Sequence, residues 1–148
     1  MSSTIHASAV LVGPKAALIR GPSGAGKSML VWDLIDAGAA GVLPFARLVA
    51  DDRAHVEARG GRLIVRPAGE LAGLLEIRGL GIRRLPYEPV ATVGCVVDLA
   101  ATDADRIPSR EAGSVEIAGV SLPRIAVAAD RPALPALLAF LRTAPAGD

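Results

Sequence analysis

One glycine-rich stretch, residues 21–28, carries the clearest chemistry in the sequence. It reads Gly21-Pro22-Ser23-Gly24-Ala25-Gly26-Lys27-Ser28 and matches G-x-x-x-x-G-K-S, the phosphate-binding P-loop. Its glycines permit positive φ and let backbone N–H groups approach a phosphate closely. In this motif Lys27 reaches the β- and γ-phosphates and the Ser28 hydroxyl holds Mg²⁺. The stretch therefore predicts a nucleotide site with a magnesium ion.

The segments on either side of the motif have the order that a P-loop requires. Residues 16–19 are apolar and indicate a buried strand, and residues 29–37 have helical spacing. A helix start would place the positive end of its dipole beside the phosphate. The alternative is a glycine-rich turn that matches by chance, which the 16 Gly of the chain make easier. One of only two lysines occupies the required position, so nucleotide binding is favoured.

Two adjacent carboxylates, Asp51 and Asp52, follow the apolar residues 48–50. In P-loop proteins a carboxylate in this place meets the Mg²⁺ of the nucleotide. Neighbouring residues of a strand point to opposite sides, so the two should have different tasks. The dipeptide alone would be read as two surface charges at a turn, but the P-loop upstream favours a role at the site.

Residues 75–82 are the second informative stretch and read Leu-Glu-Ile-Arg-Gly-Leu-Gly-Ile. On a strand, Glu76 and Arg78 would share one face and Ile77 would point to the other. An acid and an arginine beside a loop with two glycines suit a metal–phosphate site. The alternative is an ion pair on a solvated face, which contributes little to stability.

Composition and length set the wider limits. The length favours one domain over residues 1–148, and 51% hydrophobic residues supply a sizeable core. A net charge of +1 without a basic block makes nucleic acid an unexpected partner. The single cysteine, Cys95, excludes an internal disulfide and is expected to be buried. Neither a signal peptide nor a membrane span is recognisable, which predicts a cytoplasmic protein.

The periodicity predicts an α/β fold. Strands are expected at residues 4–12 and 16–20, the first two forming a hairpin, and then at 48–50, 53–57, 62–66, 91–100, 115–118 and 121–127. Helices are expected at residues 29–37, with Gly38 as the C-terminal cap, and at 131–142, with Pro132 in the first turn. Loops are expected at residues 39–45, 79–81 and 102–113.

Four blocks together resemble the HPr kinase/phosphorylase family, in its catalytic C-terminal domain. They are residues 5–7 (Ile-His-Ala), 21–28, 48–52 and 75–82, and the likeness extends over about residues 4–130. The resemblance implies an ATP-dependent kinase that phosphorylates a serine of HPr, the phosphocarrier of the sugar phosphotransferase system. It also implies phosphorolysis in the reverse direction, a P-loop kinase domain similar to the phosphoenolpyruvate carboxykinase core, and a homo-oligomer with a hexamer as first expectation.

The same resemblance implies roles for individual residues. Lys27 and Ser28 bind nucleotide and metal. Asp51 is the proton acceptor in the forward reaction and the donor in reverse, and His6 lies beside it and tunes it. Asp52 serves the metal or its waters.

Three residues later in the chain complete the implied site. Glu76 joins Asp52 at the metal, and Arg78 belongs to the signature stretch. A catalytic arginine from the later loop best matches Arg106, with Arg110 as the alternative.

Departures from the family pattern bear on the activity. The family's usual N-terminal domain is not expected here, residues 39–45 resemble a small insertion, and residues 83–89 lack the glycine-rich pattern that usually follows the signature. The second hypothesis is a non-catalytic nucleotide-sensing module that regulates a partner by binding it, and a third is a small-molecule kinase. Asp51, His6 and Glu76 together favour the enzyme.

Overall fold

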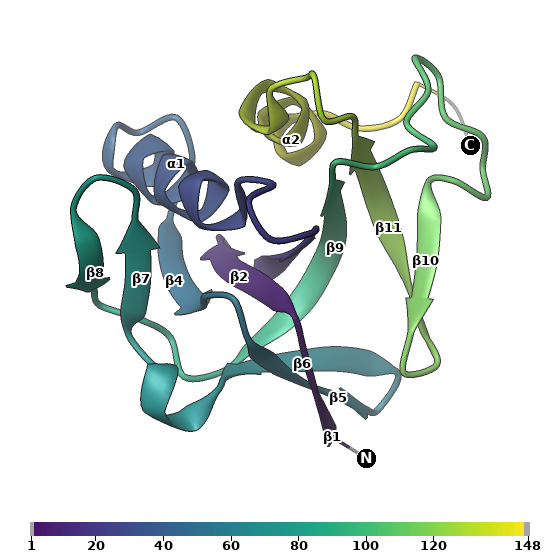
Figure 1. Ribbon diagram of the computed structural model, residues 1–148. Helices are drawn as coiled ribbons and strands as arrows, with labels where there is room; N and C mark the ends of the chain where they lie inside the picture. Colours follow the sequence, from purple (N-terminus) through teal and green to yellow (C-terminus); the bar gives the residue numbers. More distant parts are fainter. Residues whose placement is uncertain (1, 147–148) are drawn as a thin grey trace.

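A mixed β-sheet forms the centre of the molecule, and two α-helices pack against the same side of it (Figure 1). The computed structural model describes residues 2–146. The strands are, in chain order, β1 Ser2–Ile5, β2 Ala7–Val12, β3 Lys15–Arg20, β4 Ala46–Ala50, β5 Ala54–Arg59, β6 Arg62–Pro67, β7 Leu74–Ile77, β8 Gly81–Arg84, β9 Ala91–Leu99, β10 Ser114–Ile117 and β11 Val120–Val127. The helices are α1 Lys27–Ala39, α2 Ala133–Arg142 and the short 3₁₀ helix η1 Gly69–Leu71.

The sheet is parallel only around β9. Strand β9 pairs in parallel with β3 on one side and with β11 on the other. The remaining pairings are antiparallel: β3 with β2, β2 with β4, β9 with β6, β5 with both β6 and β1, and β11 with β10. Parallel pairing puts the carboxyl ends of β3, β9 and β11 at one edge, the edge at which ligands bind in open α/β sheets.

Strand β3 is buried on both faces, which holds the start of the P-loop firmly. Ala17 and Ile19 pack in the cluster that contains side chains of α1 and α2, and Ala16 and Leu18 pack in the cluster on the opposite face. The period of two along a strand explains this division. A strand with two apolar faces is the expected pattern for the parallel part of a sheet.

The predicted strand over residues 4–12 is in fact two strands. The chain breaks at His6, because β1 pairs with β5 while β2 pairs with β3, in different parts of the sheet. The expected hairpin of β2 and β3 is confirmed, and it leads directly into the P-loop.

The cap predicted at Gly38 is wrong. Helix α1 continues through Gly38 to Ala39, and Gly41 follows the helix with a φ of 81°. A Cβ on Gly38 would lie 2.8 Å from the Cβ of Ala46. Glycine is therefore needed at this position because β4 passes close to the helix.

Gly79 lies in the turn of a separate hairpin, β7–β8, and Gly81 is the first residue of β8. Their φ values of 89° and 92° agree with the expected turn, although the predicted loop over residues 79–81 ends one residue earlier. The other expected elements are present with shifted ends, Pro132 lies just before α2, and Cys95 is buried. Within the described range, neither α-helix has the length and apolar character needed to cross a membrane.

Candidate active site

The P-loop joins β3 to α1 and has the strand–loop–helix context that the sequence predicts. Gly24 and Gly26 have φ values of 83° and 99°, and a Cβ on either would meet no atom within 4 Å. These glycines are therefore required by the backbone conformation and not by lack of space. Helix α1 begins at Lys27, so its first free N–H groups and the positive end of its dipole face the loop.

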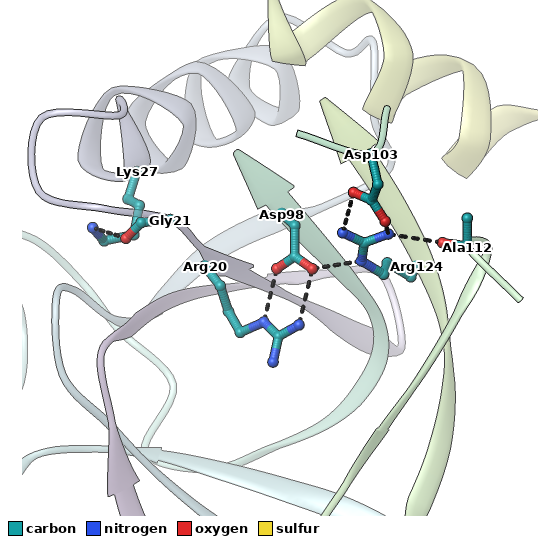
Figure 2. Close-up of polar contacts among 7 residues, drawn as sticks. All are labelled: Arg20, Gly21, Lys27, Asp98, Asp103, Ala112 and Arg124. Carbon is teal, nitrogen blue, oxygen red and sulfur yellow. Dashed lines mark hydrogen bonds and ion pairs between the residues drawn. The ribbon is translucent and has the colours of Figure 1, made fainter. Parts of the chain in front are cut away.

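Lys27 is buried, with 7% of its surface exposed, and its ammonium group turns onto the loop itself (Figure 2). Its Nζ donates hydrogen bonds to the carbonyl oxygens of Gly21 at 2.9 Å and Pro22 at 3.3 Å. Among residues 2–146, no carboxylate forms an ion pair with Lys27. The lysine charge is thus uncompensated within the described chain, as an anion site requires.

Asp51 lies behind the P-loop and is 9% exposed. One of its oxygens accepts hydrogen bonds from the hydroxyls of Ser28 at 2.7 Å and Ser8 at 2.9 Å, and the other accepts one from the backbone N–H of Glu76 at 3.2 Å. Asp51 therefore joins three separate segments: β2, the start of α1 and β7. Sequence reasoning missed Ser8, although a single hydroxyl in the apolar strand β2 was a usable signal.

Asp52 turns in a different direction from its neighbour. Its backbone is left-handed, with a φ of 68°, and its N–H donates to the Ser8 hydroxyl oxygen at 3.0 Å. Asp52 lines a cavity at the P-loop, and Asp51 is not among the residues that line it. The structure thus gives the two carboxylates separate surroundings, but not through the alternation of a strand, because β4 ends at Ala50 and Asp52 is left-handed.

That cavity, here called the phosphate cavity, has a volume of about 590 Å³. It is lined by the P-loop and the first turns of α1 on one side, and by Asp52 and the end of the β7 segment on the other: Ser23, Gly24, Ala25, Gly26, Lys27, Ser28, Met29, Trp32, Asp52, Glu76, Ile77 and Arg78. Strand β7 ends at Ile77, so Arg78 is in the turn and the shared-face argument does not apply to it. Glu76 and Arg78 nevertheless both face the cavity. Trp32 was not identified from the sequence.

The structure does not bring every predicted residue to this cavity. His6 is exposed between β1 and β2, and within the described chain the hydrogen bonds of Asp51 come from other residues. Arg106 and Arg110 are exposed in the loop between β9 and β10 and lie outside the cavity lining.

A second polar network lies on the neighbouring strands β3, β9 and β11 (Figure 2). Asp98 accepts hydrogen bonds from Arg20 at 2.7 and 2.9 Å and from Arg124 at 2.6 Å. Arg124 also donates twice to Asp103 and once to the carbonyl of Ala112, each at 2.9 Å. The network thereby fixes both ends of the loop that carries Arg106.

The pKa values within this network reflect the pairing. Burial alone would raise the pKa of Asp98, but the hydrogen bonds and charges of Arg20 and Arg124 outweigh it and lower this pKa. The pKa of Arg124 is raised, first by its hydrogen bonds to Asp103 and then by its hydrogen bond to Asp98. Both groups are therefore held in their charged forms.

The oxygen atoms around the phosphate cavity are of the kind that Mg²⁺ prefers. This ion takes oxygen ligands and is commonly held by one or two carboxylates together with phosphates and waters. The Ser28 hydroxyl, Asp52 and Glu76 supply such oxygens, and Asp51 orients Ser28. In the described residues no group of three acidic, histidine or cysteine side chains forms a protein-only metal site. This donor set fits an ion that takes some of its ligands from the protein and the others from a bound phosphate.

Fold and site together define an α/β protein with a P-loop at the carboxyl end of a buried strand and carboxylates facing it. A family model described as HPr Serine kinase C-terminal domain matches residues 1–86. The chain belongs to this family, which confirms the resemblance seen in the sequence.

Curated relatives and a solved structure agree with this assignment. An HPr kinase/phosphorylase of Streptococcus thermophilus is 33% identical over 136 residues, covering 84% of this chain and 42% of that protein. An HPr kinase/phosphorylase of Geobacillus thermodenitrificans is 31% identical over 137 residues, covering 85% of this chain and 42% of that protein. The chain thus spans less than half the length of these relatives. The Hpr(Ser) kinase/phosphatase structure from Coxiella burnetii matches with a TM-score of 0.71 and 25% identity, covering 94% of this chain and 93% of that one.

Proposed function

We propose that this chain is an ATP-dependent, Mg²⁺-dependent kinase that phosphorylates a serine of the phosphocarrier HPr in the cytoplasm. The observation that carries the proposal is the phosphate cavity, where an uncompensated lysine, a P-loop and two carboxylates meet. Family membership supplies the acceptor class. Phosphoryl transfer needs mainly positioning and charge neutralisation, and these groups supply both.

The two aspartates are assigned different tasks on the basis of their contacts. A general base must reach the proton that it removes. Asp52 faces the phosphate cavity, so it is proposed as the acceptor of the serine proton. Asp51 is buried and already accepts three hydrogen bonds, which suits holding Ser28 in place.

This assignment exchanges the roles that the family resemblance implies, in which Asp51 is the base and Asp52 serves the metal. The implied assignment remains the competing hypothesis, and with it the role of His6 as a neighbour that tunes Asp51. Ser28 and Glu76 would hold a Mg²⁺ ion, whose charge would offset that of the phosphates. The remaining cationic groups are Lys27 on the loop and Arg78 across the cavity.

The reverse reaction and the assembly are part of the same proposal. Arg78 is a candidate to clamp inorganic phosphate during phosphorolysis, because a guanidinium can make a bidentate contact. Arg106, or alternatively Arg110, is proposed to reach the phosphates only in a different arrangement of its loop or in the homo-oligomer, for which a hexamer is the first expectation.

The direct test is incubation of the chain with γ-labelled ATP, Mg²⁺ and purified HPr. Serine-bound label on HPr is expected, and an HPr variant with alanine at the acceptor serine is the control. Nucleotide binding without transfer would favour the nucleotide-sensing module instead, since His6 and Arg106 both lie outside the cavity lining.

A further inference from the structure

A second cavity opens on the other side of the first turns of α1 and has a volume of about 230 Å³. It shares Ala25, Gly26 and Met29 with the phosphate cavity, so the two hollows meet at the P-loop. Its other lining residues come from α1, from the ends of β9 and β11, and from the start of α2: Leu30, Asp33, Leu99, Ala100, Val127, Ala128, Ala129, Arg131, Pro132, Ala133 and Leu134.

We infer that this second cavity is the subsite for the nucleoside, the base and ribose of the nucleotide whose phosphates lie on the P-loop. The inference deepens the proposed function and rests on it. The reacting γ-phosphate must lie toward Asp52, Glu76 and Arg78, which face the phosphate cavity. The nucleoside must then leave the P-loop in another direction, and the second cavity begins at the same loop residues.

The position of the cavity in the sheet supports this occupant. Two of its walls are the segments that directly follow the parallel strands β9 and β11, and β3 feeds the P-loop itself. Ligands of open α/β sheets bind outside the carboxyl ends of parallel strands. Figure 1 shows that α1, α2 and the ends of these strands lie together at this edge.

The lining has the composition of a small-molecule site: mostly apolar, with few polar groups. Met29, Leu30, Leu99 and Leu134 offer apolar contact to a flat base. Asp33 lines the same cavity, and within residues 2–146 no side-chain hydrogen bond reaches its carboxylate. It is thus a free acceptor for a ribose hydroxyl or an amino group of the base. Burial, and then the neighbouring Asp36, raise the pKa of this carboxyl.

The test compares ADP with pyrophosphate, both with excess Mg²⁺, by isothermal titration calorimetry. Ala129→Trp fills the cavity from an exposed position, and Ala136→Trp makes the same change on α2 outside the lining. We expect Ala129→Trp to weaken ADP binding about tenfold or more, equivalent to 1.4 kcal/mol or more, while pyrophosphate binding stays within about twofold. Ala136→Trp should bind both as the wild type does.

A second pair of variants keeps the test independent of the bulky side chain. Asp33→Asn is expected to weaken ADP binding about fivefold, the size of one lost hydrogen bond, without weakening pyrophosphate. Asp105→Asn removes the same charge from an exposed position outside the cavity and should leave the ratio of the two affinities unchanged.

Several results would overturn the inference. Wild-type ADP affinity in Ala129→Trp would do so, as would equal losses for both ligands without a selective loss in Asp33→Asn. A selective loss of ADP binding in Trp32→Ala alone would place the nucleoside in the phosphate cavity. If the wild type binds neither ADP nor pyrophosphate, the assignment of a nucleotide site at the P-loop is wrong, and the nucleoside subsite with it. If it binds both ligands as expected but never phosphorylates HPr, only the proposed kinase function is wrong.

Discussion

The Asp51 network and the Asp98 network each centre on a carboxylate of low exposure, but their partners differ. Asp51 accepts hydrogen bonds from two hydroxyls and a backbone N–H, all neutral groups. Asp98 lies between the guanidinium groups of Arg20 and Arg124, and Arg124 is shared with Asp103. The cation of the P-loop, Lys27, donates only to carbonyl oxygens.

This difference distinguishes a ligand-binding site from an ion-pair network with a structural role. Around Asp98 the charges neutralise one another, so the network stabilises the fold and leaves little electrostatic potential to attract a ligand. Around the P-loop the charges of Lys27, Asp52, Glu76 and Arg78 are not paired with one another among residues 2–146. Charge that the described chain leaves uncompensated is available to an anion and a metal ion.

The largest effect is expected at Lys27. Lys27→Ala removes the uncompensated charge, so affinity for ATP and for pyrophosphate should fall roughly 100-fold or more, the loss typical of a buried charge contact. Calorimetry measures both, and the melting temperature should change little. Lys15→Ala, at the other lysine, is the control. Unchanged nucleotide affinity in Lys27→Ala would refute the P-loop assignment.

The next largest effect is expected at Asp52, and it should differ in kind from the effect of the same substitution at Asp51. Asp52→Asn should retain Mg-ATP binding but reduce transfer to HPr by roughly 100-fold or more, the usual size of a general-base contribution. Asp51→Asn should instead change the Mg²⁺ dependence, because it disturbs the orientation of Ser28. Binding, metal titration and transfer rates are measured for both. The reverse pattern would restore the base role that the family resemblance implies for Asp51.

Asp98 should affect stability and not chemistry. Within the described chain, Asp98→Asn leaves Arg20 without a carboxylate partner and Arg124 with Asp103 alone, and we expect a loss of roughly 2–4 kcal/mol in unfolding free energy at pH 7. A lowered folded-state pKa means that Asp98 stabilises above its ordinary value of 3.8, and this contribution disappears as the pH falls through the lowered pKa. The difference between wild type and variant should therefore shrink below about pH 4.

Denaturant unfolding from pH 7 to pH 2.5 checks this prediction. Asp105→Asn removes an exposed carboxylate from the adjoining loop and serves as the control. A difference of constant size over the whole pH range would mean that the loss at Asp98 does not come from its charge.

The smallest effect is expected when arginine is replaced by lysine at Arg78, and the same replacement at Arg124 provides the comparison. Arg78→Lys should leave stability unchanged and weaken phosphorolysis of phospho-HPr about tenfold, more than it weakens the kinase direction, because lysine cannot make a bidentate phosphate contact. Arg124→Lys should lower the melting temperature without altering the ratio of the two directions. Equal losses in both directions for Arg78→Lys would assign it to general positioning.

The sequence by itself determined the P-loop and its flanking strand and helix. These features depend on residues within a few positions of one another, where backbone geometry and side-chain periodicity act directly. The turn at Gly79 and Gly81 was predictable for the same reason. The family could also be recognised, because its motifs are contiguous.

Only the tertiary structure decided which aspartate faces the phosphate cavity, because the left-handed backbone at Asp52 and its hydrogen bond to Ser8 depend on how β2 and β4 pair. It also joined Asp98 to Arg20 and Arg124, which lie 78 and 26 positions away. The second cavity arises where α1, α2 and the ends of β9 and β11 meet. Such contacts depend on strand order and register, which bring together residues whose local sequence carries no sign of their partners.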